Sequence, residues 1–178
     1  MKRILLIYGG ASGLLCTLIL ILNTWFTIEN SRSNYSILIG YASIALCSGI
    51  IIMGMQKIAR LRNFKFNLLF GSGVLMLLIL CSLYALGWMA FYNSKAIDFK
   101  AHYKSQLEET WKGENLSEEE LIYSRDEFEI KWNQYSRPIN MAIYSFSEPF
   151  LPGLLILLVA SAFLSAYEGG LPAKNKIE

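Results

Sequence analysis

The sequence predicts an all-α membrane protein in which four transmembrane helices form a bundle, with an extracytoplasmic helical hairpin between helices three and four. The 178 residues are 54% hydrophobic and 17% charged, with a mean hydropathy of +0.38. An average soluble domain has about 25% charged residues. Four long runs contain no charged residue. The chain has 16 basic and 14 acidic residues, and 18 of these lie between Lys95 and Glu148.

A helix needs about 20 apolar residues to cross the hydrocarbon core of a bilayer. Four uncharged runs meet or approach this length, at residues 4–26, 37–55, 68–92 and 150–167. The first run follows Lys2 and Arg3, as a signal peptide would, but it is long and no small-residue cleavage site follows it closely. We therefore expect it to remain as a span. The absence of ionisable residues from all four runs argues against a proton relay, an ion pathway or a membrane haem.

Basic residues near the ends of the spans predict the orientation. They precede the first span, fill the second loop and recur in the tail, at Lys2, Arg3, Lys57, Arg60, Arg62, Lys65, Lys174 and Lys176. Residues 93–148 contain seven bases and eleven acids, a net charge of −4. We expect both termini in the cytoplasm and residues 93–148 outside it. The loop bases Lys57, Arg60, Arg62 and Lys65 are the predicted topology and lipid anchor, because each base near anionic lipid contributes about 1 kcal/mol.

Residues 95–137 are predicted to form the helical hairpin. Each arm has an apolar stripe at helical spacing, formed by Phe99, Tyr103, Leu107 and Trp111 and then by Leu121, Phe128, Trp132 and Tyr135. Gly113 interrupts the arms, and Ser117 with Glu120 predicts a capping box at the start of the second arm. The two stripes are expected to bury each other.

The acidic residues of the hairpin have two interpretations. Catalytic or metal-binding carboxylates would need to converge with a histidine or with buried neighbours. A solvated helix face needs nothing more, and it is favoured because consecutive carboxylates point in different directions around a helix. The predicted partner surface comprises Glu118, Glu119, Asp126 and Glu127. The one histidine, His102, is expected to be solvated, so no catalytic residue, metal ligand or cofactor is predicted.

The expected domain organisation has four parts. Residues 1–94 form the first three membrane helices, 95–137 the hairpin, 138–149 an interfacial segment, and 150–178 the fourth membrane helix with a cytoplasmic tail. Pro149 and Pro152 suit the first turn of that fourth helix. The alternative is one long helix that is kinked at the prolines, and the separate interfacial segment is slightly favoured.

Small residues line a face of each span and favour close helix packing. Gly9 and Gly13 have GxxxG spacing in the first span, and Ala42, Ala45 and Gly49 share a stripe in the second. Packing within the chain is the preferred interpretation, with a homodimer as the alternative. The three cysteines lie in separate spans without a CxxC pair, so they are expected to act as small apolar residues.

The chain resembles the bacterial four-helix membrane proteins of the family known as domain of unknown function 4199. The resemblance extends over nearly the whole length, through Ile39-Gly40-Tyr41, Gly54, Arg60, Arg62-Asn63, the Ser-Glu-Glu-Glu-Leu turn, Pro149, Gly153-Leu154-Leu155 and Ser161-Ala162. It implies the inner membrane of a bacterium, and it brings no established activity or catalytic residue.

Three functions remain open. The leading hypothesis is a non-enzymatic interaction or scaffold subunit that contacts another membrane or periplasmic protein through its hairpin. The second is a carrier or channel for a small neutral solute. An enzyme that uses Glu148 and His102 ranks last, because the sequence indicates no third catalytic group to act with them. A net charge of +2 and the absence of a nucleic-acid-binding motif exclude nucleic acid as the expected partner, which leaves the bilayer and proteins.

Overall fold

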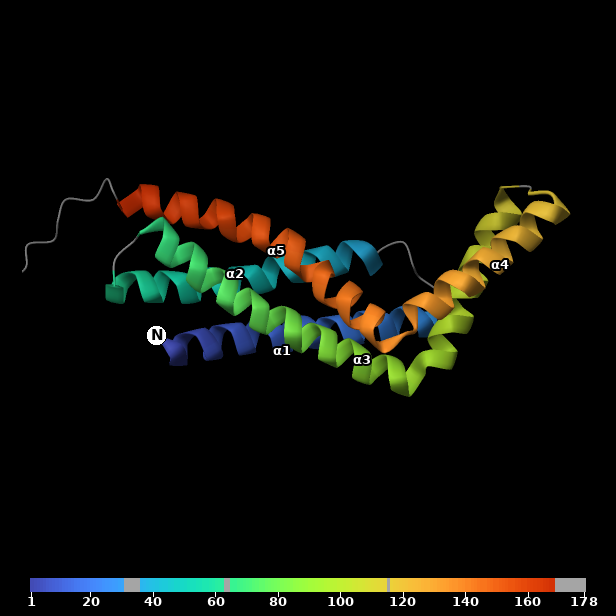
Figure 1. Ribbon diagram of the computed structural model, residues 1–178, viewed down its shortest axis with the longest axis horizontal. Helices are drawn as coiled ribbons and strands as arrows, with labels where there is room; N and C mark the ends of the chain where they lie inside the picture. The colour runs from blue at the N-terminus through green and yellow to red at the C-terminus, as the bar shows by residue number, and fades with distance from the viewer. Residues whose placement is uncertain (31–35, 63–64, 115, 169–178) are drawn as a thin grey trace, which may run out of the picture.

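The computed structural model describes residues 1–30, 36–62, 65–114 and 116–168, which fold into five helices and, within these ranges, no strand (Figure 1). The helices are α1 (Lys2–Asn30), α2 (Ser36–Arg62), α3 (Phe66–Gly113), α4 (Glu118–Tyr135) and α5 (Pro138–Glu168). Four segments are long and apolar enough to cross a membrane, at Lys2–Ile28, Ile37–Leu61, Phe66–Lys95 and Pro138–Ala166. The predicted all-α membrane class with four spans is confirmed.

The helix α3 occupies the centre of the bundle, where it contacts α1, α2 and α5. The helices α1 and α5 do not pack closely against each other in the described part of the chain. The outer part of α3 and the whole of α4 project from one end (Figure 1). We call this the arm end, and we call the opposite end, where α1 begins, the terminal end.

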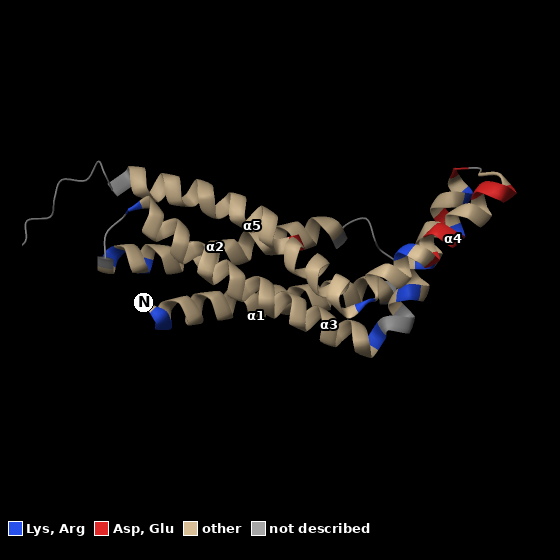
Figure 2. Cartoon of the chain, viewed as in Figure 1, with Lys and Arg blue, Asp and Glu red and all other residues tan. Residues whose placement is uncertain are grey.

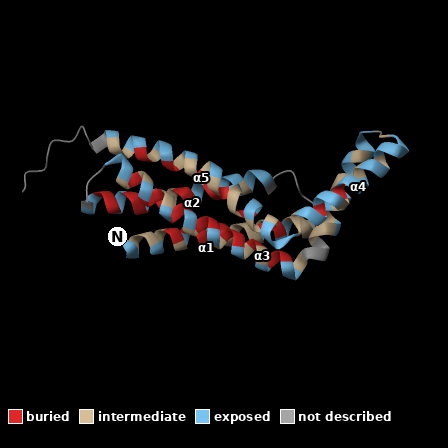
Figure 3. Ribbon diagram, viewed as in Figure 1, coloured by how far each residue is buried: buried red, intermediate tan, exposed pale blue. Residues whose placement is uncertain are grey.

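Two glycines let α1 and α3 approach closely. A Cβ atom placed on Gly13 of α1 would lie 2.8 Å from Leu83 Cδ1, and one on Gly87 of α3 would lie 2.1 Å from Thr17 Cγ2. The predicted small-residue contact within the chain therefore occurs between these helices. Apolar side chains fill the rest of the bundle interior, including the fully buried Met55, Leu69 and Met76, and Figure 3 shows buried residues along the inner faces of its helices.

The small-residue face expected on the second span does not pack against another helix that the structure describes. Ala42 and Ala45 of α2 are exposed, and a Cβ atom on Gly49 would meet no atom within 4 Å. The buried face of α2 instead contains larger side chains such as Ile44 and Ile51. The expectation that this stripe packs within the chain was wrong, because the adjacent face of the helix contacts α1 and α3.

The helix α3 changes direction at Lys95, whose φ of −131° and ψ of 15° are not helical. This is the residue at which the sequence places the start of the hairpin. Beyond it, α3 continues to Gly113, and α4 begins after Ser117. The predicted capping box is present, since Ser117 Oγ accepts a hydrogen bond from the Glu120 backbone N–H and the Glu120 carboxylate accepts one from the Ser117 N–H.

The helix α5 corrects the expected boundary of the fourth span. It begins at Pro138 and contains Pro149 and Pro152 in its interior, so a separate interfacial segment at residues 138–149 was the wrong choice of the two alternatives. Proline has no N–H, and the carbonyl groups of Ser145 and Glu148 therefore lack their usual helical donors four residues ahead. Packing of α5 against α2 and α3 compensates for this loss.

Basic residues collect at the terminal end, as Figure 2 shows. Lys2 and Arg3 begin α1, Lys57 and Arg60 lie near the end of α2, and Lys65 precedes α3. Lys174 and Lys176 lie outside the described residues. The arms contain most of the described acidic residues.

Candidate functional site

An aromatic cluster joins the arms to the bundle. Its buried members come from α3, α4 and α5, and they are Trp88, Phe91, Tyr92, Phe128, Trp132 and Met141. The ring of Trp132 lies 6.2 Å from that of Tyr92, 5.9 Å from that of Phe99 and 5.6 Å from that of Phe128. Aromatic pairs at these separations attract one another in addition to the area that they bury.

Two hydrogen bonds fix the base of α4 to α3. The Trp88 indole N–H donates to the Tyr135 hydroxyl over 2.7 Å, and the hydroxyl groups of Tyr92 and Ser136 are 3.0 Å apart. Burial raises the pKa of Tyr135. The rings of Trp88 and Tyr92 are buried between the helices.

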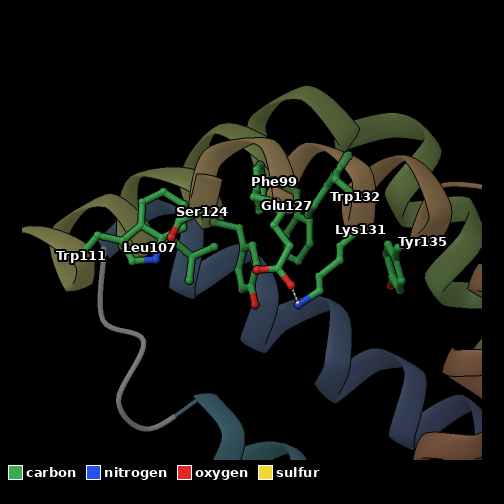
Figure 4. A pocket seen from close by; sticks show the side chains of 10 residues that line it. Phe99, Leu107, Trp111, Ser124, Glu127, Lys131, Trp132 and Tyr135 are labelled. Carbon is green, nitrogen blue, oxygen red and sulfur yellow. Dashed lines mark ion pairs between the residues drawn. The ribbon is translucent and has the colours of Figure 1, made fainter. Parts of the chain in front are cut away.

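The two arms leave a groove between them. It has a volume of about 520 Å³, within the range of ligand sites in proteins. Side chains from both arms line it, namely Phe99, Tyr103, Leu107, Trp111, Ser124, Glu127, Phe128, Lys131, Trp132 and Tyr135 (Figure 4). Phe128 and Trp132 are buried, while Tyr103 is 45% exposed. The apolar stripes thus meet in part, and the rest of their surface is accessible.

Ion pairs join the arms beside this groove. Glu129 of α4 pairs with Lys100 at 2.7 Å and with Lys104 at 3.2 Å, both on α3. Hydrogen bonds from these two lysines hold the pKa of Glu129 below its ordinary value. Arg125 and Glu108 form a longer pair at 3.5 Å. These pairs link α4 to the outer part of α3.

The predicted partner surface divides into two parts. Glu118, Glu119 and Asp126 are exposed, and they form no ion pair within the described part of the chain. Glu127 instead lies beside the groove, where it pairs with Lys131 at 2.7 Å and raises the pKa of that lysine. The structure brings Glu127 to the aromatic groove, and it leaves the other three residues facing solvent.

The predicted lipid anchor lies at the terminal end. The Lys57 ammonium is 6.0 Å from the centre of the Tyr8 ring, and Lys57, Arg60 and Lys65 are exposed. The Arg62 backbone ends α2, and its side chain lies outside the described residues. The lipid role of these bases stays a prediction.

Sequence reasoning named Glu148 but misjudged its position relative to the fourth span. It was placed just before the fourth span, but α5 and the span Pro138–Ala166 both include it. At a helical rise of 1.5 Å per residue, it lies roughly 15 Å along α5 from Pro138. The Tyr84 hydroxyl of α3 donates a hydrogen bond of 3.0 Å to its carboxylate. The uncharged run 139–147 before Glu148 was the signal that could have extended the span.

Glu148 lines two cavities at the arm end, between α1 and α5. The outer cavity, of about 260 Å³, also contains His102 and Tyr135. The inner cavity, of about 330 Å³, also contains Ser43 and Tyr84. Leu20, Thr24 and Glu148 line both, so the two cavities adjoin. The structure therefore brings His102 and Glu148 to one cavity, although they are far apart in the sequence.

The comparison with known families agrees with this architecture. The family model described as a protein of unknown function, DUF4199, matches residues 7–165. The chain belongs to the DUF4199 family. The matched region of this DUF4199 chain includes the groove and both cavities. The chain matches no curated protein and no solved structure.

Within the described residues of the DUF4199 chain, no three His, Cys, Asp or Glu side chains are placed to hold a metal ion. Its three cysteines, Cys16, Cys47 and Cys81, are free and fully buried in the bundle core. They occupy the apolar positions that the sequence assigned to them.

Proposed function

We propose that this DUF4199 protein is a non-enzymatic subunit of a bacterial inner membrane that holds a segment of a partner protein in the groove between its arms. Both termini lie in the cytoplasm in this proposal, and the arms lie outside it. The basic residues at the terminal end support the orientation, since such residues are enriched on the cytoplasmic side of membrane helices. The accessible aromatic groove is the observation on which the proposed function depends.

The groove favours a segment with apolar side chains next to basic ones. Aromatic rings line its interior, so an apolar side chain gains by entering it. Glu118, Glu119 and Asp126 are exposed on α4, the helix that forms one side of the groove, and they pair with no cation among the described residues. Basic residues beside the apolar segment would complement these charges, which raises the rate of association and selects the partner.

The packed interior of the bundle makes a carrier the weaker candidate. Met55, Ile58, Leu69, Met76 and Leu157 are fully buried in one cluster. The polar cavities lie at the arm end, beside Glu148. This packing supports binding at the arm end over passage of a neutral solute through the bundle.

A labelled peptide tests the proposal. The probe contains a phenylalanine- and leucine-rich stretch followed by three lysines, and its fluorescence anisotropy is measured with the purified protein in detergent. Ser124 lines the groove, so Ser124→Trp should fill the groove and weaken binding at least about tenfold, a change of 1.4 kcal/mol. The matched control is Ser105→Trp, at an exposed position of α3 that does not line the groove.

A second variant tests the charges. Combining Glu118→Gln, Glu119→Gln and Asp126→Asn should weaken binding and reduce its dependence on salt, because screening acts on exposed charges. A version of the peptide with three glutamates in place of the lysines should bind the wild-type protein weakly. Equal binding of the lysine peptide by the wild-type and Ser124→Trp proteins would contradict the proposal.

A further inference from the structure

Glu148 lies inside a candidate membrane span and has no cationic partner among the residues that the structure describes. Its one hydrogen bond with a described residue is the bond from Tyr84. No Lys or Arg among the described residues lines either of the cavities that it shares. An ionisable side chain at membrane depth is unfavourable unless it is paired, and such residues mark binding sites more often than structural positions.

Two hydroxyl groups in the cavities that Glu148 lines already use their protons elsewhere. Ser43 in the inner cavity donates its hydroxyl proton to the Gly40 carbonyl over 2.7 Å, and Thr27 in the outer cavity donates its own to the Asn23 carbonyl over 2.8 Å. The oxygen lone pairs of these hydroxyls remain able to accept. A ligand with a positive charge and hydrogen-bond donors would therefore match both the carboxylate and these two hydroxyls.

We propose that Glu148 and its two cavities bind a primary ammonium group. An R–NH₃⁺ group has one positive charge and three donors, which matches a carboxylate flanked by acceptor hydroxyls. Tyr41 and Tyr84 line the inner cavity, and Trp88 and Tyr144 line the outer one. Aromatic rings at these positions also attract an organic cation. A divalent metal ion fits less well, since it needs several anionic or carbonyl ligands and, among the side chains that the structure describes, Glu148 is the one carboxylate that lines either cavity.

The ammonium group can come from an aminolipid headgroup or from a free amine. Ile37 and Tyr41 line the inner cavity and are 72% and 58% exposed on the surface of the bundle. A lipid whose chains lie against this surface could place its headgroup in the cavity. A free amine would enter through the outer cavity, where His102 and Tyr144 are at the arm end.

Native mass spectrometry of the purified protein with defined lipids tests the lipid source. Dioleoyl phosphatidylethanolamine should remain bound, and Glu148→Gln should reduce its retention at least about tenfold, as removal of one partner of a charge pair does. Dioleoyl phosphatidylcholine, whose trimethylammonium group has no N–H donor, should be retained less. Glu119→Gln is the matched control, because this exposed carboxylate of α4 lines neither cavity.

Melting temperatures test whether a free amine binds at this site, and they also show whether each variant is folded. Ethylammonium chloride should raise the melting temperature of the wild-type protein above that in tetramethylammonium chloride at equal ionic strength, and Glu148→Gln should abolish the difference. Ser43→Ala, which keeps the carboxylate, should weaken binding several-fold. Ser124→Trp should leave it unchanged, since Ser124 lines the groove and neither cavity. A difference between the two lipids alone, or between the two salts alone, supports the proposal and identifies the source of the ammonium group. Equal retention of the two lipids together with equal melting temperatures in the two salts would overturn the proposal, as would persistence of these differences in Glu148→Gln.

Discussion

The indole N–H of Trp88 in α3 donates a hydrogen bond of 2.7 Å to the hydroxyl of Tyr135, the last residue of α4. This contact lies at the junction of the arms and the bundle, where both rings belong to the aromatic cluster. It couples the position of α4 to the membrane helices, so a partner bound between the arms would act on a rigid base.

Tyr135→Phe should lower the free energy of unfolding by about 1–3 kcal/mol, because the buried Trp88 N–H loses its acceptor. Thermal unfolding followed by tryptophan fluorescence measures the change. Tyr123→Phe is the control, since Tyr123 is 70% exposed. Equal stability of the Tyr135 variant and the wild type would show that water replaces the phenol at no cost.

The two tryptophans of the groove should respond differently to truncation. Trp132 is 9% exposed and contacts rings from both arms, so Trp132→Ala should cost about 3–5 kcal/mol. Trp111 is half-buried near the tip of the arms, and Trp111→Ala should cost less while weakening peptide binding. Hydrogen exchange across α4, beside the peptide assay, separates the two effects. Similar exchange in both variants would contradict this division.

Gly87→Ala should destabilise the bundle by about 1–3 kcal/mol, the usual cost of overpacking, because its methyl group would collide with Thr17 of α1. Gly49→Ala adds the same group to α2 where nothing lies within 4 Å. It should be neutral or stabilising, since alanine favours a helix over glycine by up to about 1 kcal/mol. Melting temperatures in one detergent compare the pair, and an equal loss in both variants would count against the α1–α3 contact.

Glu129 should make the stability of the arms depend on pH. Its pKa in the folded protein lies below the ordinary value of 4.5, owing to Lys100 and Lys104. The carboxylate therefore stabilises the fold above pH 4.5, and this contribution is lost as the pH falls through the lowered pKa. Glu129→Gln should melt earlier than the wild type at pH 7, and the difference should shrink at pH 3. Glu119→Gln should show no difference at pH 7.

The proposed orientation predicts opposite labelling of two single-site variants in intact cells. Ser105→Cys on the arms should react with an impermeant thiol reagent, while Lys174→Cys should react only after the membrane is permeabilised. The native cysteines are fully buried, so they should contribute little background. Labelling of Lys174→Cys alone would reverse the orientation.

The sequence alone determined the features that depend on local composition. Uncharged runs of about 20 residues require helices in a bilayer, and the capping box at Ser117 and Glu120 forms from residues three apart. The apolar stripes of the arms were likewise readable from their helical spacing. The stripe Ala42, Ala45 and Gly49 misled because small residues permit close packing on either face of α2, and periodicity does not say which face has a neighbour.

Only the tertiary structure decided what lies at the arm end. A proline inside a helix destabilises that helix locally. The helix α5 nevertheless packs against α2 and α3 and continues through both prolines, so the span begins at Pro138. That extension placed Glu148 against Tyr84, a residue 64 positions away. The width of the groove depends on the distance between α4 and the outer part of α3, which the aromatic side chains between these helices set. Contacts between distant parts of a chain depend on the sum of packing over the whole bundle, which no local pattern contains.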